Sequence, residues 1–466
     1  MSDGTVTVPV GGTIDDLSIS PLTLTPAFSP SIADYYVRCD AGSNDLTLSI
    51  TTGGSTSTSE HILNEGDAII VGDNWVRCLP HDFPNVVVTA HPDVGTPTPG
   101  YYLVSDNIFA AALDVNGTPV WYERELAACD VDSFSPDTLS YLPNAEFPYA
   151  FDGKSVFDIH SLDTGDVETV SSPDAPTDEH ELRVLDDGTF LLFSDPLVTG
   201  VDLTGLSTFG SDETIADCEI EQVDGSGNLL WSWRATDHVD PVKESVAPGV
   251  NKINGVNVDD VFHCNAIDVG PNNDLLVSQR HTSALYDIDR GTGTVQWKLG
   301  GTAFSKDGAP HLAVTGDDFG GFNLQHDARF TGSNTITLFD DHGLDAGAGS
   351  GVARGLELQL DHGAGTATVS YQVRGKAESQ FMGSFRRDAD GHSVVGWGYV
   401  PTDARILTEV DADGNDVLDV GFVLPPPLKA SDAVSYRAIK VPLSQLDHNK
   451  LRAAVVADTG SGSGAD

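Results

Sequence analysis

The sequence predicts an all-β protein, a six-bladed β-propeller preceded by a small β-sandwich, and three observations carry this prediction. The chain is rich in Gly, Thr, Val and Asp, and no long stretch shows the periodicity of an amphipathic helix. Turn-forming residues recur at short intervals between runs of β-forming residues. A strand–turn–strand pattern also repeats along most of the chain. These features are typical of a protein built from antiparallel hairpins.

Residues 1–91 differ from the rest of the chain and predict the small β-sandwich. The segment LTLTPAFSPSIADYYV is followed by short alternating runs that are rich in Thr and Ser. It resembles the cadherin-like modules of bacterial surface and secreted proteins. Nothing in this part has a catalytic pattern, so we expect a spacer, a docking surface or a cap on the next domain. The Pro/Gly-rich stretch DVGTPTPGYY marks the boundary.

One hairpin pattern repeats through residues 92–456. Its copies are ALDVNGTPVWYER, EQVDGSGNLLWSWRA, DIDRGTGTVQWKLGG, LDHGAGTATVSYQVR and EVDADGNDVLDVGF, and DIHSLDTGDVETVS is a less regular one. We expect each copy to be the outer hairpin of a four-stranded unit whose inner hairpin precedes it. Six such units predict a six-bladed β-propeller. The Gly/Ser-rich tail, residues 457–466, is expected to be disordered.

Acidic residues far outnumber basic ones, with 70 Asp and Glu against 24 Lys and Arg and a formal net charge of -46. Nucleic acid and anionic membrane surfaces need a basic footprint, so neither is an expected partner. An Asp-rich surface fits a salt-rich, halophilic setting, where ions screen self-repulsion, and plain solubility is the alternative. No apolar run reaches the length of a membrane span, and MSDGTVTVPVGG is not the pattern of a signal peptide.

The five cysteines show no metal-binding spacing. Cys39 and Cys78 each end a predicted strand within the sandwich, and they could form a disulfide. Cys264 directly follows a histidine, but we expect a packed strand residue there rather than a catalytic thiol.

Three predicted inner hairpins open on a histidine, at His180, His263 and His326. Because the innermost strand of each blade lines the central channel, the three imidazoles should meet near one mouth of it. Pairing within the hairpins should bring Arg280 back beside His263 and His342 back near His326. The remaining histidines show no such pattern.

Three imidazoles and a guanidinium suit a tetrahedral oxyanion, and the amide of Asn265 adds a neutral donor. An imidazole can also attack a sulfuryl or phosphoryl centre and hold that group covalently. A three-histidine metal site is the competing interpretation, but an arginine among the ligands would repel the cation, so no metal is expected. A repeated histidine that only supports blade structure is a third interpretation. Gly383 takes the corresponding position in the next unit, where a small residue could leave room for a ligand.

The run HCNAIDVGPNNDLLVSQRHTSALYDIDRGTGTVQWKLGG, together with NGTPVWY and FNLQHDARF, resembles the bacterial arylsulfotransferases that use no nucleotide sulfate donor. The resemblance covers roughly residues 95–445. It implies a six-bladed propeller with a central site and no cofactor. It also implies ping-pong transfer of a sulfuryl group from an aryl sulfate to a phenol, through a sulfated histidine.

The motifs of that family assign roles to residues of this chain. His326, in the family's Q-H-D-A-R motif, would be the nucleophile, and the other members would bind sulfuryl oxygens and move the phenol proton. The implied catalytic residues are His326, His263, His180 and Arg280, and the implied substrate-binding residues are Asn265, Arg280, His180 and His342. Small-molecule aryl sulfates and phenols are therefore the expected partners.

Two other functions stay open on the sequence alone. One is a metal-dependent hydrolase that uses the three histidines as ligands, and the other is a non-catalytic propeller for ligand binding or adhesion. A secreted, periplasmic or cell-surface location is expected in each case, and the sequence makes no prediction of oligomeric state.

Overall fold

The computed structural model describes residues 5–106, 108–145, 155–253, 255–343, 351–424 and 433–454. Strands dominate this part of the chain, so the all-β prediction is confirmed. The helices within it are the short segments α1 (Ala235–His238), α2 (Pro241–Glu244) and α3 (His448–Ala453). None of them has the length and apolar character that a membrane span requires. The tail predicted to be disordered, residues 457–466, lies outside the described residues.

Two sheets at the N-terminal end share one hydrophobic core. One sheet has the order β1 (Val6–Val8), β6 (Ala68–Val71), β7 (Asn74–Leu79) and β3 (Asp34–Arg38), and the other has β2 (Asp16–Ser20), β4 (Asn44–Thr52) and β5 (Ser55–Leu63). In β4, Leu46, Leu48 and Ile50 alternate with polar residues and turn one face toward this core. Cys39 and Cys78 form the disulfide that the sequence left open.

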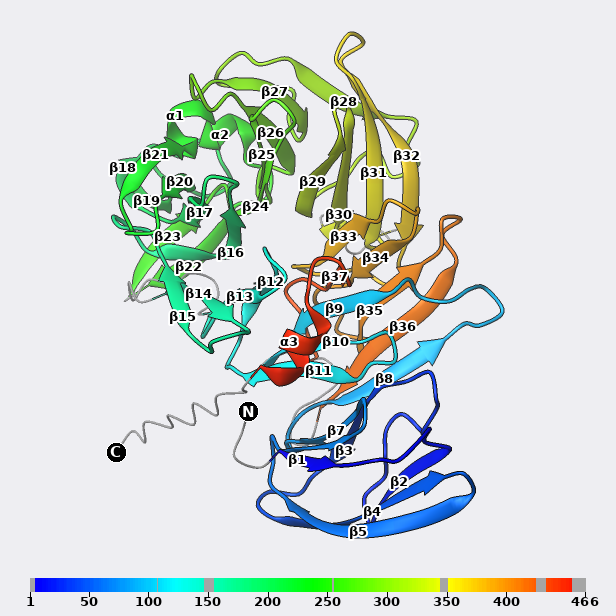
Figure 1. Ribbon diagram of the computed structural model, residues 1–466. Coiled ribbons are helices and arrows are strands. Elements are labelled where there is room, and N and C mark those ends of the chain that lie inside the picture. Colours follow the sequence, from blue (N-terminus) through cyan, green and yellow to red (C-terminus); the bar gives the residue numbers. More distant parts are fainter. Residues whose placement is uncertain are drawn as a thin grey trace.

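The rest of the chain forms six antiparallel units of four strands (Figure 1). The first unit has β37 (Ile439–Pro442), β9 (Gly100–Ser105), β10 (Phe109–Leu113) and β11 (Pro119–Arg124), and the second has β12 (Cys129–Asp132), β13 (Thr138–Leu142), β14 (Phe157–Ser161) and β15 (Val167–Val170). The third has β16 (Thr177–Val184), β17 (Phe190–Ser194), β20 (Glu219–Val223) and β21 (Leu229–Arg234), and the fourth has β24 (Cys264–Val269), β25 (Leu275–Gln279), β26 (Ala284–Ile288) and β27 (Val295–Gly300). The fifth has β29 (His326–Gly332), β30 (Thr335–Asp340), β31 (Arg354–Asp361) and β32 (Thr366–Arg374), and the sixth has β33 (Ser384–Arg387), β34 (Ser393–Gly396), β35 (Arg405–Val410) and β36 (Asp416–Val423). Each of the six repeated hairpins in the sequence is an antiparallel strand pair in these units.

The six units lie around a common centre, with β16, β24 and β29 close to it (Figure 1). Neighbouring first strands contact one another, as β12 does with β16, β16 with β24, and β24 with β29. Strand β37 comes from the C-terminal end of the region and pairs with β9, so the first unit combines two distant parts of the chain.

Six further strands lie outside the four-stranded units. Strand β8 (Asn85–Ala90), within the range that the sequence assigned to the sandwich, pairs with β36 of the last unit. Strand β28 (His311–Thr315) pairs in parallel with β27 and β32 and joins two units into one nine-stranded sheet. A separate sheet has the order β18 (Leu197–Val201), β19 (Glu213–Ala216), β23 (Val256–Asp260) and β22 (Gly249–Ile253).

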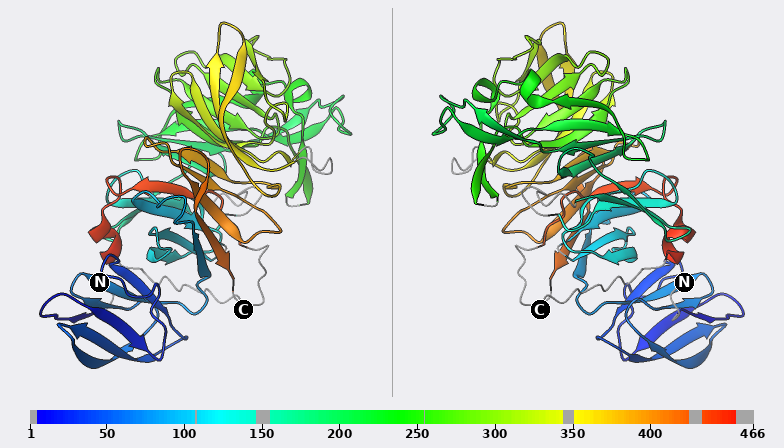
Figure 2. Two further views of the ribbon diagram at one scale, coloured as in Figure 1. Left: turned by 90° about the vertical axis from the view of Figure 1, so that its right-hand side faces the viewer. Right: turned by 90° about the vertical axis from the view of Figure 1, so that its left-hand side faces the viewer.

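The sandwich is held against the larger region by buried charge. Arg452 of α3 makes two hydrogen bonds of 2.9 Å to the carboxylate of Asp34 in β3, and both residues are buried. A two-oxygen contact of this kind fixes orientation as well as distance. Figure 2 shows the sandwich at one end of the molecule, next to α3.

Candidate active site

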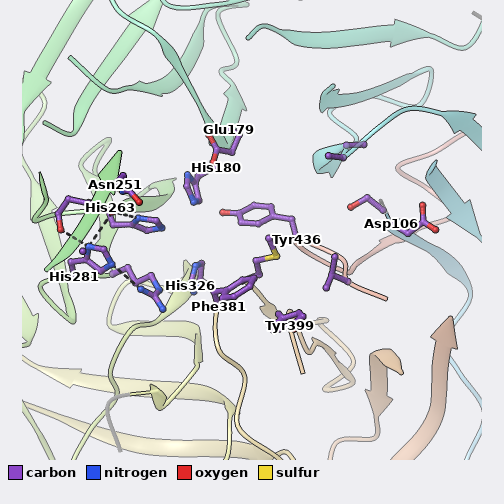
Figure 3. A pocket seen from close by; sticks show the side chains of 18 of the residues that line it. Asp106, Glu179, His180, Asn251, His263, His281, His326, Phe381, Tyr399 and Tyr436 are labelled. Carbon is purple, nitrogen blue, oxygen red and sulfur yellow. Dashed lines mark hydrogen bonds and ion pairs between the residues drawn. The ribbon is translucent and has the colours of Figure 1, made fainter. Parts of the chain in front are cut away.

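A cavity of about 720 Å³ lies where β16, β24 and β29 begin. Its lining includes His180, His263, His326 and Arg280, together with His281 and Tyr436. The structure therefore brings together the three histidines and the arginine that the sequence singled out. Figure 3 shows the three histidines in the lining.

The backbone is irregular where each histidine stands. The pairing register shifts at the start of β16, β24 and β29, as it does at a β-bulge, so residues there leave the regular alternation of the strand. His263 has a φ of 53° and Asp327, next to His326, has a φ of 52°. Residues other than glycine adopt this left-handed conformation rarely, and they hold it only where the surroundings fix it.

Each of the three imidazoles is held by a carboxylate through Nδ1. The distances from Nδ1 to the nearest carboxylate oxygen are 2.8 Å for His180 and Asp178, 2.6 Å for His263 and Asp260, and 2.7 Å for His326 and Asp341. A carboxylate accepts the hydrogen bond, so it places a proton on Nδ1 and leaves Nε2 as the nitrogen available to a ligand.

The imidazoles of His326 and His263 are neutral at pH 7. Burial lowers the pKa of His326 well below its ordinary value, and the positive charge of Arg280 lowers this pKa further. Burial also lowers the pKa of His263 to about 4, although Asp260 opposes the shift. A neutral ring with its proton on Nδ1 carries a lone pair on Nε2, and that lone pair is what a nucleophile or a base needs.

The neighbouring histidine is charged instead. Burial lowers the pKa of His180, but the carboxylates of Asp178 and Glu179 outweigh it and raise the pKa to about 9. Glu179 itself is fully buried, and neither carboxylate oxygen bonds to another residue within the described part of the chain. Burial and the charge of Asp178 raise the pKa of Glu179 to about 8. Of the three histidines that the sequence singled out, one is thus protonated and two are neutral.

Arg280 lies beside these rings because of hairpin pairing. It directly follows β25, and its backbone N–H donates to the carbonyl of His263 at 2.8 Å. The side chain is partly buried. Its Nη2 donates to the carbonyl of Gln380, and its Nη1 lies 2.9 Å from Nε2 of His281.

Two residues with implied substrate-binding roles are not among the lining residues of the cavity. Asn265 is fully buried, and its amide donates to the carbonyl of Gln325, the residue before His326. The backbone N–H and ring of His342 lie near the carboxylate of Asp340, with Nδ1 at 3.4 Å. Both side chains therefore contact the protein scaffold around the site.

The glycine in the next unit does not leave space for a ligand. A Cβ at Gly383 would overlap the ring of Phe339, so the protein fills the room that this glycine provides. Its φ of 104° also belongs to the region that favours glycine.

An aromatic pair also lines the cavity, and Figure 3 shows Phe381 close to His326. The rings of Phe381 and Tyr399 are stacked, with centroids 4.7 Å apart and planes 6° apart. Phe381 is 38% exposed. Flat apolar surfaces of this kind suit an aryl group.

A second disulfide, which the sequence did not predict, joins Cys264 to Cys218. Cys264 is the buried first residue of β24, as expected of a packed strand residue, and it is not a thiol. The bond ties the residue after His263 to the segment that precedes β20 in the neighbouring unit.

Removal of this disulfide is expected to weaken both stability and activity. A double Cys218→Ala and Cys264→Ala variant should lose about 2–4 kcal/mol of unfolding free energy, because the unfolded chain gains a long open loop. Its kcat should also fall, because the disulfide at the next residue would no longer help to hold the backbone of His263 in its left-handed conformation. Chemical denaturation and steady-state kinetics measure the two effects. The Cys39→Ala and Cys78→Ala pair is the control, because its disulfide lies in the sandwich. An unchanged kcat in the first pair would show that the bond has no part in placing His263.

Some of these side chains could hold a metal ion. The ligand atoms of Asp260, His263 and His281 lie within 4.8 Å of one another. The three histidines singled out by sequence do not form such a group among the described residues. The guanidinium of Arg280 bonds to His281 at this point, and its charge would oppose a cation.

The carboxylates that hold the imidazoles were missed by sequence reasoning. Asp178 and Asp260 precede their histidines by two and three residues, whereas Asp341 follows His326 by fifteen. The aspartates close to His180 and His263 were a visible signal, but without a common spacing they could not be told from the many surface aspartates.

Several solved structures resemble this chain distantly. A protein of unknown function from Bacteroides caccae has 12% identity, with 74% of this chain and 99% of that chain covered, and a TM-score of 0.43. A protein from Lactobacillus plantarum has 14% identity, coverage of 70% and 83%, and a TM-score of 0.36. Virginiamycin B lyase from Staphylococcus aureus has 8% identity, coverage of 75% and 90%, and a TM-score of 0.35. Similarities of this size support no inference about the present chain.

The sequence matches one protein family over most of the region that contains the cavity. No curated protein matches the chain. The family model described as arylsulfotransferase (ASST) matches residues 153–422, which is more than half of the 466 residues and includes the three histidines and Arg280. The chain belongs to the arylsulfotransferase family.

Proposed function

We propose that this protein transfers a sulfuryl group from an aryl sulfate to a phenol through a sulfated His326, without a nucleotide donor or another cofactor. The observation that carries the proposal is the environment of His326. Its Nδ1 is held by Asp341 at 2.7 Å, its ring is neutral, and Arg280 lines the same cavity. Membership of the arylsulfotransferase family supports sulfuryl transfer as the chemistry.

We also propose that the six four-stranded units are the blades of a β-propeller. Pairing of β37 with β9 supports this, because a ring closed by a strand from the other end of the region has no open break between its first and last blades. The cavity would then lie at one mouth of the central channel.

In the first half of the reaction, Nε2 of His326 attacks the sulfur of the aryl sulfate. The new N–S bond forms as the bond between sulfur and the aryl oxygen breaks, and the electron pair leaves with the phenolate. His180 is protonated at pH 7, so its Nε2–H can donate a proton to that oxygen and release the phenol.

The second half reverses these steps with a different phenol. Neutral His180 accepts the hydroxyl proton while the acceptor oxygen attacks sulfur, and the N–S bond returns its electron pair to His326. His180 regains the proton that it gave, so the cycle is balanced. Neutral His263 offers a lone pair on Nε2, which suits a hydrogen bond from the acceptor hydroxyl.

Arg280 supplies positive charge to the sulfuryl oxygens in both halves. Sulfuryl transfer has little covalent work for the protein to do, so positioning and charge account for most of the acceleration. For Asn265 we propose a supporting role, because its amide holds the backbone carbonyl next to His326.

The rate of the first half should fall as the pH rises through about 9. His180 is charged below its raised pKa and loses the proton that it donates above it. The lowered pKa of His326 keeps that ring neutral on the acid side. The fall should be steeper for 4-methylphenyl sulfate than for 4-nitrophenyl sulfate, because the poorer leaving group depends more on the acid. Burst-phase phenol release between about pH 6 and pH 10 measures this. Equal pH profiles for the two donors would contradict the role of His180.

Intact-mass measurement tests the proposed function directly. After mixing with 4-nitrophenyl sulfate and no acceptor, the wild-type protein should gain the mass of one sulfuryl group, and added phenol should remove it. The His326→Ala variant should gain none. If both proteins gain the same adduct, His326 is not the nucleophile; if neither gains one although the donor binds, the protein is a binding propeller.

A metal-dependent hydrolase is the second candidate, because Asp260, His263 and His281 could hold a cation. The proposed transferase predicts that dialysis against a chelator leaves the transfer rate unchanged. Loss of activity with the chelator, restored by zinc, would favour the hydrolase.

Compartment and salt dependence are part of the proposal. The two disulfides support an oxidising location, which agrees with a secreted, periplasmic or cell-surface protein. The net charge of -46 supports adaptation to salt, since screening relieves self-repulsion in the folded state. Detection of the protein in cell fractions, and denaturation at low and high salt, test these two expectations.

A further inference from the structure

The residue that follows Arg280 is a buried histidine to which the sequence gave no role. His281 is 6% exposed and lines the cavity. Its Nδ1 lies 2.9 Å from the backbone carbonyl of Asp260, and its Nε2 lies 2.9 Å from Nη1 of Arg280. A carbonyl only accepts and a guanidinium only donates, so Nδ1 carries the proton and Nε2 accepts from Arg280. The ring is therefore neutral and its tautomer is fixed.

The guanidinium of Arg280 is anchored at two points. Nη1 donates to His281, and Nη2 donates to the carbonyl of Gln380. Its Nε is buried and has no hydrogen-bond partner within the described part of the chain. A buried donor on a charged group without a partner is costly, which makes the placement of this guanidinium a specific feature of the site. Two N–H groups on one side of a guanidinium also match two oxygens of a sulfate.

Arg280 and the protonated His180 are the positive charges that line this cavity among the described residues. Arg280 is the only Lys or Arg among the described residues that line the cavity, in a chain with a net charge of -46. A free arginine side chain would have to be ordered when the sulfate arrives, at a cost in affinity. An arginine that is already anchored avoids most of that cost.

The ring of His281, which anchors Arg280, is itself held in place by Asp260. Asp260 accepts from Nδ1 of His263 at 2.6 Å and lies 3.3 Å from Nδ1 of His281. The two rings have centroids 4.7 Å apart. The carboxylate of Asp260 therefore orients both the ring of His263 and the ring of His281 that holds Arg280.

We infer that His281 is a positioning residue that holds the Arg280 guanidinium in place for the sulfuryl group, an inference that rests on the proposed function. It predicts that binding of the aryl sulfate requires a hydrogen-bond acceptor at the position of Nε2. It does not require an imidazole ring as such.

Two substitutions separate these possibilities. Asparagine at position 281 reaches only about as far as Nδ1, so His281→Asn keeps a donor for the carbonyl of Asp260 and removes the acceptor for Arg280. Glutamine reaches about as far as Nε2, so His281→Gln keeps that acceptor. Each change is made together with His326→Ala, which prevents transfer, and binding of 4-nitrophenyl sulfate is measured by titration calorimetry.

We expect His281→Asn to weaken donor binding by about tenfold or more relative to the His326→Ala parent, since it removes a hydrogen bond to a charged group. His281→Gln should restore most of the lost affinity. With His326 present, His281→Asn should raise KM for the donor more than it lowers kcat. Thermal unfolding of each variant checks that it is folded.

A matched control is His160→Asn. His160 is a histidine of β14 with low exposure that pairs with Glu123 and is not among the cavity-lining residues. Its donor affinity should equal that of the parent. The positioning role of His281 would be overturned if His281→Asn bound the aryl sulfate as tightly as the parent. It would also be overturned if His281→Asn and His281→Gln lost the same affinity. Either result would leave the proposed function standing. Absence of donor binding by the parent would overturn the proposed function as well.

Discussion

Replacement of His326 by alanine is expected to lower kcat/KM for sulfuryl transfer by about 10⁴–10⁶-fold, the effect expected when a covalent nucleophile is removed. The imidazole lies 2.7 Å from a buried carboxylate and is itself 2% exposed, so neither water nor another side chain can take its exact place without rearrangement. Binding of the donor should change little, because Arg280 and the aromatic pair of Phe381 and Tyr399 remain.

Steady-state kinetics with 4-nitrophenyl sulfate and phenol measure the loss, and donor binding by calorimetry separates chemistry from affinity. Added imidazole should recover part of the activity, because it can enter the space that the side chain leaves. The His160→Ala variant, in another unit and outside the cavity lining, is the control and should keep its turnover. A His326→Ala variant with wild-type kcat would remove the basis of the mechanism.

The second large effect is expected at Asp341. Burial raises the pKa of this carboxyl, and the positive charge of Arg280 opposes that shift. Because Arg280 lies close to the pair, we assign the shared proton to Nδ1 of His326 and the negative charge to Asp341. In Asp341→Asn the amide can donate to Nδ1, which moves the ring proton to Nε2 and removes the attacking lone pair. We expect kcat to fall by about 10⁴-fold, as in other enzymes whose histidine is held in the wrong tautomer.

Single-turnover release of nitrophenol measures this loss, with donor affinity unchanged. Asp307→Asn is a matched control, because Asp307 holds Nδ1 of His238 at 2.8 Å and neither residue is among those that line the cavity. That variant should keep its rate. If Asp341→Asn retained the wild-type rate, the carboxylate would have no part in setting the tautomer of His326.

Local sequence patterns predicted the hairpins and part of the site. Each hairpin is closed by a short Asp/Gly turn, and such a turn fixes which residues face each other across the pair. For that reason the sequence could place Arg280 beside His263, and the two residues are joined by a backbone hydrogen bond of 2.8 Å. Three histidines at the same place in three hairpins were visible for the same reason.

The same reasoning is less informative where contacts cross between units. The substrate-binding roles of Asn265 and His342 stay predictions, and the structure adds that Asn265 holds the backbone carbonyl of Gln325 in the next unit while His342 lies near Asp340. The sequence also predicted room for a ligand at Gly383, and this prediction is wrong because the ring of Phe339 fills that space. A hairpin pattern shows which end of a strand a residue occupies, but it does not show which neighbouring side chain occupies the adjacent space.

The sequence by itself determined the all-β class, the repeated hairpins and the recurrence of histidine at one end of three of them, because these depend on residues close together in the chain. Only the tertiary structure decided which nitrogen of each ring is held, which imidazole is charged, and how Arg280 is anchored. The aspartates and the histidine that set these properties have no common spacing from the residues they hold. Their effect on charge also depends on burial, which exists only once the units pack around the cavity.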